Sequence, residues 1–345
     1  MHIRLLGKPT VAQDNPMSLH NYFAWPSIAK LQNGTIAVVS SGYRREHLCP
    51  FGKAVISYSD DSGKTYTRPA PVIDTPLDNR DAGVTVFGEN GVVVTSFSNT
   101  TDEYRAWNAT DPYACAYLDR LTADDEARFL GSAFRFSFDC GKTFGRLYRS
   151  PVTSPHGMTA LRDGSLLWVG TEFGGEDIHA YLVNTDGTMQ KRGTIPTDHA
   201  AEYCEPHTVA LPDGTLLCHF RAESETLFTL YQTKSADGGK TWTSPRRLLP
   251  DTGGAPAHLL RHSSGVLLCA YGYRTKPYGV RVMCSADEGE TWETDHVLYD
   301  RAADDDCGYP ASVELDNGSM LTVFYAHPER DAPAVILQQR WRIET

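Results

Sequence analysis

Acidic, basic and aromatic side chains stand at the ends of several short apolar segments of this chain. Glu205 and Arg221 flank one pair of such segments, Arg274 follows another pair, and Tyr309 begins a third. Guanidinium groups bind carboxylates through paired N–H donors, a geometry that lysine does not reproduce. If the fold brings these residues together, they form a polar site suited to an anionic ligand.

The elements that must position these residues form a repeat. An apolar strand, a turn of the Asp-Gly or Asn-Gly type and a second apolar strand recur six times. The copies span residues 25–39, 82–97, 156–170, 205–220, 256–271 and 308–325. The strands are too apolar to face water, so each hairpin must be buried between neighbours. Six such units predict an all-β fold, a six-bladed β-propeller with four-stranded antiparallel blades.

A second motif, S-x-D-x-G-x-T-aromatic, which we call the Asp box, follows the hairpin in four of the six units. Its aspartates are Asp61, Asp139, Asp237 and Asp287. The Asp side chain accepts backbone N–H bonds, the glycine allows a left-handed residue, and the aromatic ring packs between sheets. A structural role is therefore preferred over a catalytic one for these aspartates.

The repeat accounts for residues 1–345 as one propeller. The stretch from Asp102 to Gly131 interrupts blade two and has helical composition, so we expect helices there, over one mouth of the propeller. After the sixth hairpin only PAVILQQRWRI remains, and we expect the N-terminal strand from His2 to Val11 to close the last blade.

Hairpin geometry predicts which side chains reach the centre. Strand one of a blade lines the axis and strand two runs back beside it, so the start of the first and the end of the second share one end of the axis. The Asp boxes fall at the opposite end. The residues at the predicted mouth are Arg44, Arg45, Glu46, His47, Arg80, Asp81, His156, Glu172, Glu205, His207, Arg221, His258, Tyr273, Arg274, Asp305, Asp306, Tyr309 and Tyr325. Such a gathering is typical of a polar ligand site, although runs such as 44–47 are equally compatible with a solvated rim.

With its Asp boxes and hairpin repeat, nearly the whole chain resembles the sialidase family, and the segments EPHTVALPDGTLLCHFR and CGYPASVELDNGSMLTVFY resemble the catalytic region of that family. The resemblance implies an exo-acting glycoside hydrolase that removes a terminal acidic sugar, sialic acid or a relative. It implies Tyr309 as nucleophile, Glu205 as general base, and Arg221 and Arg274 as a carboxylate clamp. A neutral phenol suits such a substrate, because the sugar's own carboxylate would repel an anionic nucleophile.

Two features depart from the family pattern. Where sialidases carry F-R-I-P this chain has Phe23-Ala24-Trp25-Pro26, and the following loop YRREHLCPFG has no aspartate to act as acid/base. Arg80 and Arg44 are the candidates for the missing arginine, and Asp81, Glu46 and His47 are the candidates for the acid/base. Trp25 is placed either to stack against a sugar or to pack in the core.

No metal or cofactor is expected, since the eight cysteines show neither a CxxC pair nor zinc-ligand spacing. One alternative stays open, because His47, His156, His207 and His258 lie near the predicted mouth and are possible metal ligands, substrate-binding groups or a general acid/base. The formal charge of −11 argues against a nucleic-acid partner, and no segment has the length of a membrane helix. Apolar contexts around the cysteines and the lack of a visible signal peptide lead us to expect a cytoplasmic protein.

Three functions remain open from the sequence. The first is the glycoside hydrolase of sialidase type. The second is a propeller that binds an acidic glycan without cleaving it, which the two departures favour. The third is a glycosidase or lyase for a different acidic sugar, because propellers host many activities.

Overall fold

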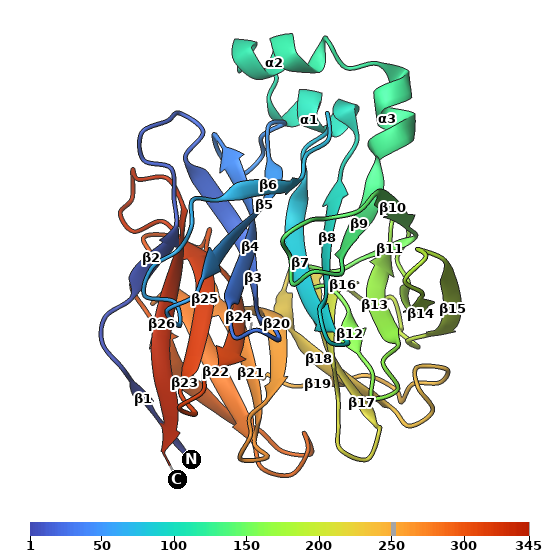
Figure 1. Cartoon of the computed structure of the whole chain (residues 1–345), viewed down its shortest axis with the longest axis vertical. Helices are drawn as coiled ribbons and strands as arrows, with labels where there is room; N and C mark the ends of the chain where they lie inside the picture. Colours follow the sequence, from blue (N-terminus) through green and yellow to red (C-terminus); the bar gives the residue numbers. More distant parts are fainter. Residues whose placement is uncertain (250–252, 345) are drawn as a thin grey trace.

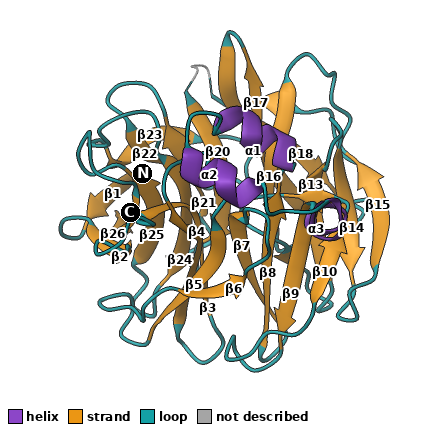
Figure 2. Ribbon diagram, turned by 90° about the horizontal axis from the view of Figure 1, so that it is seen from above, coloured by secondary structure: helices purple, strands orange, loops and turns teal. Residues whose placement is uncertain are grey.

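The computed structural model describes residues 1–249 and 253–344, and these residues form six antiparallel sheets around a central axis (Figure 1, Figure 2). Each sheet is four strands deep, with one extra short strand in two of them. The prediction of a six-bladed β-propeller is confirmed.

The blades follow one another along the chain, with the innermost strand first in each. Blades one to three consist of β3 (Tyr22–Lys30), β4 (Ile36–Arg44), β5 (Lys53–Ser59) and β6 (Ala70–Ile73); β7 (Arg80–Phe87), β8 (Gly91–Ser98), β9 (Gly131–Ser137) and β10 (Leu147–Ser150); and β11 (Val152–Thr153), β12 (Thr159–Ala160), β13 (Leu166–Glu172), β14 (Ile178–Val183) and β15 (Met189–Thr194). Blades four to six consist of β16 (Glu202–Ala210), β17 (Leu216–Ser224), β18 (Leu227–Ser235) and β19 (Arg246–Arg247); β20 (Gly254–Arg261), β21 (Leu267–Tyr273), β22 (Gly279–Ser285) and β23 (Glu293–Tyr299); and β24 (Gly308–Glu314), β25 (Met320–Ala326), β26 (Val335–Glu344) and β1 (His2–Leu5).

The two ends of the chain meet in the last blade. β1 pairs antiparallel with β26, and the short strand β2 (Thr10–Gln13) pairs with β26 as well. The sixth sheet therefore joins the first residues of the chain to the last, and both termini lie at the same end of the propeller (Figure 1).

Apolar side chains fill the spaces between neighbouring blades. One cluster joins Trp25 and Val38 of blade one to Val313 and Tyr325 of blade six. Complete burial of one large apolar side chain contributes about 1.5–3 kcal/mol, so these contacts hold adjacent blades together. Near the axis the packing is close enough to require glycine, because a Cβ on Gly83 would lie 2.3 Å from the backbone nitrogen of Gly157 in the next blade.

Three short helices lie between β8 and β9, namely α1 (Thr101–Trp107), α2 (Pro112–Leu118) and α3 (Ala123–Phe129), within the described residues. Each has an N-cap side chain, and α1 and α3 have complete capping boxes at Thr100 and Thr122. They cover the end of the propeller opposite the termini (Figure 1), and the view onto that end shows α1 and α2 in front of the ring of blades (Figure 2).

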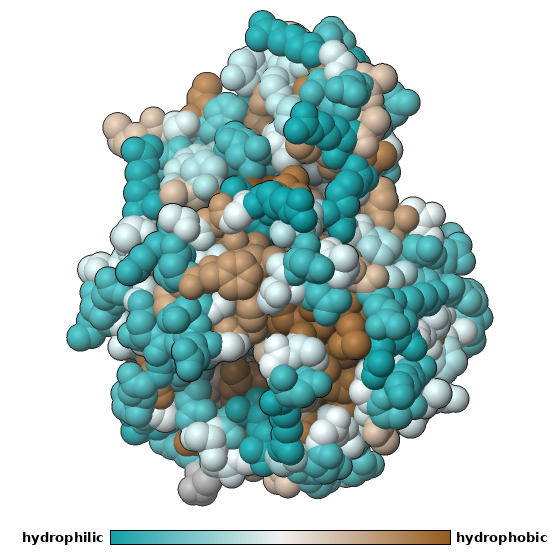
Figure 3. Space-filling model, turned by 45° about the vertical axis from the view of Figure 1, so that its right-hand side comes forward, coloured by the Kyte–Doolittle hydropathy of each residue, from teal (hydrophilic) through white to brown (hydrophobic). Residues whose placement is uncertain are grey.

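Hydrophilic residues dominate the face seen in the space-filling view, and apolar residues are visible toward its middle, below the helical projection (Figure 3). Within the described residues, no helix has the length and apolar character needed to cross a membrane.

Candidate active site

Four residues with left-handed backbone conformations lie in the first halves of four innermost strands. The φ angles are 52° at Trp25, 47° at Asp81, 55° at Glu205 and 48° at Tyr309. Each residue lies at a β-bulge, where the register between the first and second strands of its blade shifts. Positive φ is uncommon outside glycine, and a bulge redirects the side chain that it carries. The bulges therefore place four side chains from four blades at one end of the axis.

Tyr309 and Glu205 form the centre of this group. The Tyr309 hydroxyl donates a hydrogen bond to Oε1 of Glu205, and Nη1 of Arg221 lies 3.0 Å from Oε2 of the same carboxylate. Burial raises the pKa of Tyr309 well above its ordinary value, and the charge of Glu205 raises it further. The phenol is therefore neutral at physiological pH, with a carboxylate in hydrogen-bond contact that can accept its proton.

Two arginines from neighbouring blades flank the phenol. Arg221 also reaches Glu223, at 3.3 Å, and Arg274 lies 5.8 Å above the Tyr309 ring. Arg274 donates to the carbonyl oxygen of Cys307 and to the hydroxyl of Tyr325, at 3.1 and 3.2 Å. Both guanidinium groups lie over the Phe228 ring, an apolar surface that supports them from one side.

Arg80 is the third cation at this end. Its guanidinium carbon lies 4.2 Å from the centre of the Trp25 ring, and its charge acts on Tyr309 and Asp81. Its side chain makes no hydrogen bond or ion pair within the described part of the chain, and its Nε is buried without a hydrogen-bond partner. A buried guanidinium with unused donors is a prepared site for an anion.

Asp81 has an environment that opposes ionisation. Burial raises the pKa of its carboxyl to about 7 against the opposing charge of Arg80, and the negative charge of Glu205 contributes to the rise. Oδ1 is buried with no hydrogen-bond partner among the described residues. A carboxyl that holds its proton near neutral pH is able to act as a general acid.

Asp81, Glu205 and Arg221 line a hollow of about 270 Å³, together with Glu172 and Phe173 from the end of β13 and the turn after it. We call this hollow the central pocket. A neighbouring hollow of about 480 Å³ reaches Arg274 and Phe228. The exposed fractions of the Arg221 and Glu205 side chains are 15% and 13%, so both remain accessible from the pocket.

Arg44 and Trp25 do not line this pocket. Arg44 is completely buried and donates to Asp78, to Ser41 and to the carbonyl oxygens of His47 and Cys49. Its hydrogen bonds hold the interior together, which corrects the hypothesis that it joins the clamp. Trp25 is 1% exposed and contacts the guanidinium groups of Arg80 and Arg44, so it has no open face for a sugar ring.

His47 and Glu46 lie farther out at the same end. His47 Nδ1 is 2.8 Å from Oδ1 of Asp306, and its ring meets Trp25 edge-on at 4.9 Å. Glu46 is exposed and makes no hydrogen bond or ion pair with the rest of the described chain. Neither residue lines the central pocket, whereas Asp81 does.

The other three histidines pack against each other inside the ring. The rings of His207 and His258 are stacked at 4.5 Å, and His156 meets them edge-on at 5.4 and 5.1 Å. Burial lowers the pKa of all three, that of His207 to about 4, so they are neutral. Nδ1 of His207 accepts the backbone N–H of Leu259, which leaves the proton on Nε2 and makes that nitrogen a donor. A metal ligand instead has a free lone pair on the metal side, so this geometry disfavours metal binding at Nε2 of His207.

One cluster in the described part of the chain has the spacing of metal ligands. It comprises Glu172, Asp177 and His179 at the β13–β14 hairpin. Nζ of Lys191 lies 3.2 Å from Nε2 of His179 and occupies the same space with a positive charge. The three side chains and Lys191 therefore form a set of polar contacts.

The sequence model of the BNR repeat-like domain matches residues 135–323, more than half of the 345 residues. The chain belongs to this family. No curated protein matches the sequence. A protein of unknown function from Dyadobacter fermentans aligns in structure over 99% of both chains, with 22% identity and a TM-score of 0.83.

Other structures similar to this BNR repeat-like protein are more distant in sequence. The NanB sialidase of Streptococcus pneumoniae has 13% identity and a TM-score of 0.72 over 98% of this chain and 71% of its own. An α-L-arabinanase of Penicillium chrysogenum has 15% identity and a TM-score of 0.65 over 97% of both chains. These likenesses confirm the propeller fold.

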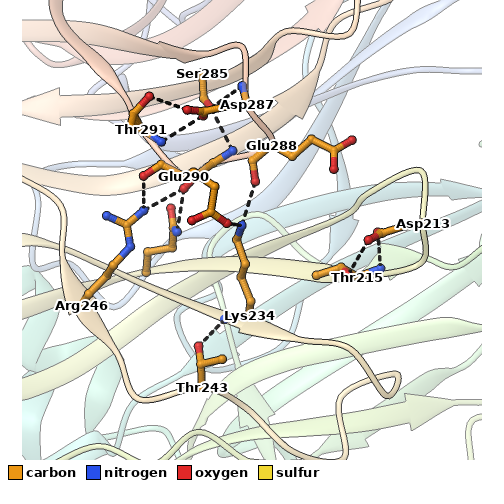
Figure 4. Close-up of polar contacts among 12 residues, drawn as sticks. Asp213, Thr215, Lys234, Thr243, Arg246, Ser285, Asp287, Glu288, Glu290 and Thr291 are labelled. Atoms are coloured by element: carbon orange, nitrogen blue, oxygen red, sulfur yellow. Dashed lines mark hydrogen bonds and ion pairs between the residues drawn. The ribbon is translucent and has the colours of Figure 1, made fainter.

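The Asp boxes of this BNR repeat-like protein close their own turns. In blade five Asp287 accepts hydrogen bonds from Ser285 and from both the backbone and the hydroxyl of Thr291 (Figure 4). Hydrogen bonds from Thr291 hold the pKa of Asp287 well below its ordinary range. Asp61, Asp139 and Asp237 make the same contacts. These carboxylates are occupied within the turn.

Several residues of the site were not singled out from the sequence of this BNR repeat-like protein. They are Asp78, Tyr104, Tyr22, His327 and Phe228. Asp78 and Tyr104 come from a loop and a helix whose contact depends on the whole fold. A usable signal existed for the bulges, because proline follows Trp25, Glu205 and Tyr309 at the same place in three blades.

Proposed function

We propose that this protein is a glycoside hydrolase that removes a terminal acidic sugar with retention of configuration, using Tyr309 as the nucleophile. The observation that carries the proposal is the hydrogen bond from the Tyr309 hydroxyl to Glu205, with Arg221 paired to that carboxylate, Arg274 over the phenol ring and the charge of Arg80 acting on the phenol. The distant sialidases and arabinanase of the same fold agree with a carbohydrate substrate.

Arg80, Arg221 and Arg274 hold the carboxylate of the sugar in this mechanism. Arg80 comes from blade two and replaces the arginine that sialidases carry in blade one, where this chain has Ala24 and Trp25. Its unused donors fit that role. Each charge-assisted hydrogen bond contributes about 1.5–3 kcal/mol, which selects acidic over neutral sugars.

In the first step the Tyr309 oxygen attacks the anomeric carbon while its proton passes to Glu205. Asp81 donates its proton to the glycosidic oxygen, the bond to the leaving group breaks, and a covalent aryl glycoside forms between the Tyr309 oxygen and the anomeric carbon. In the second step Asp81 takes a proton from water, which attacks the anomeric carbon. Tyr309 departs and recovers its proton from Glu205, so both carboxyl groups return to their starting states.

Binding of an acidic glycan without cleavage is the second candidate. The ion pair between Arg221 and Glu205 favours it, because the guanidinium already engages the carboxylate that would have to accept the proton of the phenol. A lyase for a uronic-acid glycoside uses the same clamp and differs in its product, which absorbs ultraviolet light.

A panel of sialosides and uronosides, incubated with the protein and analysed for released sugar, separates these functions. We expect release of one acidic sugar, and loss of that release by at least about 10³-fold in Tyr309→Phe. Tyr66→Phe, which removes a phenol hydroxyl at the Asp-box end, is the matched control and keeps full turnover. Binding without release across the panel supports the second candidate and contradicts the hydrolase.

A further inference from the structure

A larger hollow of about 750 Å³ opens at the same end as the central pocket, between blades one and six and the first helix. Tyr22, His47, Trp107, Asp306, His327 and Arg330 line it. We call this hollow the side pocket. Its volume falls in the range of about 300–1,000 Å³ that is usual for small-molecule sites.

The floor of the side pocket is a carboxylate held by four donors. Asp306 accepts hydrogen bonds from the hydroxyls of Tyr22 and Tyr325, at 2.6 and 2.9 Å. Nδ1 of His47 and Nε2 of His327 lie 2.8 and 3.1 Å from its two oxygens. With every lone pair engaged, Asp306 holds its neighbours in place and has little capacity left for a ligand.

The two histidines on Asp306 differ in charge. His327 faces acceptors with both nitrogens, Asp306 at one and the carbonyl oxygen of Ala332 at 2.7 Å from the other, so it carries two protons. His47 donates to Asp306 through Nδ1, and burial lowers its pKa. Nε2 of His47 is consequently an acceptor without a partner among the described residues, at the edge of the side pocket.

The charges of the side pocket cancel. Arg45, Arg330 and protonated His327 face Glu46, Asp306 and Asp331. The surroundings of Tyr309, in contrast, include three arginines, namely Arg80, Arg221 and Arg274, against the carboxyl groups of Glu205 and Asp81. Trp107 adds a 42% exposed aromatic surface at the end of α1. An aromatic face beside mixed donors and acceptors of balanced charge suits a neutral polyhydroxylated ring, whose C–H faces pack on indole.

The side pocket is coupled to the centre through shared residues. The His47 ring contacts Trp25, which contacts Arg80, and Tyr325 donates to Asp306 while accepting from Arg274. We propose that the side pocket binds a neutral sugar unit, with Trp107 as the stacking surface and Nε2 of His47 accepting a sugar hydroxyl. Its assignment to the leaving-group side of the substrate rests on the function proposed above, whereas the binding of a neutral sugar does not.

The test is titration calorimetry with a panel of neutral disaccharides, namely lactose, N-acetyllactosamine, cellobiose, maltose and xylobiose. We expect at least one to bind the wild-type protein and to bind Trp107→Ala and His47→Phe at least about tenfold more weakly. Phe138→Ala removes an aromatic ring that is 59% exposed at the Asp-box end, and it leaves the affinity unchanged. Thermal melting verifies that the variants are folded, and the 42% exposure of Trp107 makes its replacement mild.

Arg221→Ala separates this proposal from the function of the central pocket. It abolishes binding of acidic sugars and leaves binding of the neutral disaccharide intact if both proposals hold. Neutral-sugar binding without any release of acidic sugar retains the side pocket and overturns the hydrolase. No binding by any member of the panel, or binding that ignores both pocket substitutions, overturns the side-pocket proposal.

Discussion

Aspartates at the two ends of the propeller differ in their electrostatic environment. At one end the Asp-box carboxylates, such as Asp287, accept hydrogen bonds inside a solvated turn, and their pKa lies well below the ordinary range. At the other end Asp81 lies on a bulge with one unpartnered oxygen, and burial raises its pKa to about 7. The same residue type is therefore stabilised as an anion at one end and as an acid at the other.

This difference separates structural from chemical roles. A satisfied carboxylate in a turn fixes the backbone, and the repetition of the turn in four blades fits that purpose. A buried carboxyl that lacks a partner destabilises the fold unless it performs a function, and perturbed pKa values gather at functional sites. The left-handed backbone at Asp81, Glu205 and Tyr309 adds strain at the same place.

Of the substitutions that compare the two ends, Asp81→Asn has the largest expected effect on turnover. The amide fits the space but donates no proton, so we expect turnover of the acidic-sugar substrate to fall by about 10²–10⁴-fold. Asp287→Asn is the matched substitution at the other end and retains wild-type turnover. Steady-state kinetics measure the turnover of both variants. Equal losses in the two would contradict the division of roles.

Arg80→Ala tests whether the central pocket recognises a carboxylate through the arginine of blade two. We expect KM to rise by about 10–100-fold, because a charge-assisted contact of about 1.5–3 kcal/mol is removed. With a methyl ester of the same substrate the wild-type protein and Arg80→Ala should differ little. A similar loss on both substrates would mean that Arg80 acts by supporting Trp25.

The environment of Asp81 is also testable without a substrate, through the pH dependence of the free energy of unfolding. Because the pKa of Asp81 is raised, its proton stabilises the folded state at low pH, and this contribution is lost as the pH rises toward about 7. We therefore compare the free energy of unfolding of the wild-type protein with that of Asp81→Asn. The difference between the two should change by up to about 1.4 kcal/mol per pH unit between roughly pH 4 and 7, as measured by chemical unfolding. The amide variant gains relative stability as the pH rises. Parallel curves would place Asp81 in a less buried setting.

Asp287→Asn has the smallest expected effect on chemistry and acts on stability. The lowered pKa of the carboxylate stabilises the fold above its ordinary pKa of about 3.9 and is lost below it. We expect a lower melting temperature at pH 7 and a smaller difference from wild type as the pH falls below 4. Calorimetry measures both. An unchanged melting temperature at pH 7 would show that this turn does not depend on its charge.

The sequence predicted the architecture well because the fold repeats. Six hairpins and four Asp boxes supply the same information several times, and strand direction alone places Glu205 and Tyr309 at one end. The choice between Arg44 and Arg80 was beyond the sequence. It depends on Asp78, which accepts a hydrogen bond from Arg44, whereas the Arg80 side chain has no hydrogen-bond partner in the described chain.

The side pocket was beyond the sequence for a related reason. Asp306 and His47 are far apart in the chain, and each alone resembles a solvated charge in a loop. Only the closed ring brings them together with His327 and with Trp107 of the first helix. Repeated local patterns predict a scaffold, whereas contacts between different loops require the folded chain.

The central claim, that Tyr309 attacks the anomeric carbon, is tested most directly by trapping the covalent intermediate. The acidic sugar that the panel identifies is prepared as its fluorinated glycosyl fluoride, which forms the intermediate and hydrolyses slowly. Mass spectrometry of the digested protein should find one sugar on the peptide that contains Tyr309, and none on that peptide in Tyr309→Phe. A label on Glu205 or Asp81, or turnover of the reagent by Tyr309→Phe at the wild-type rate, would contradict the account.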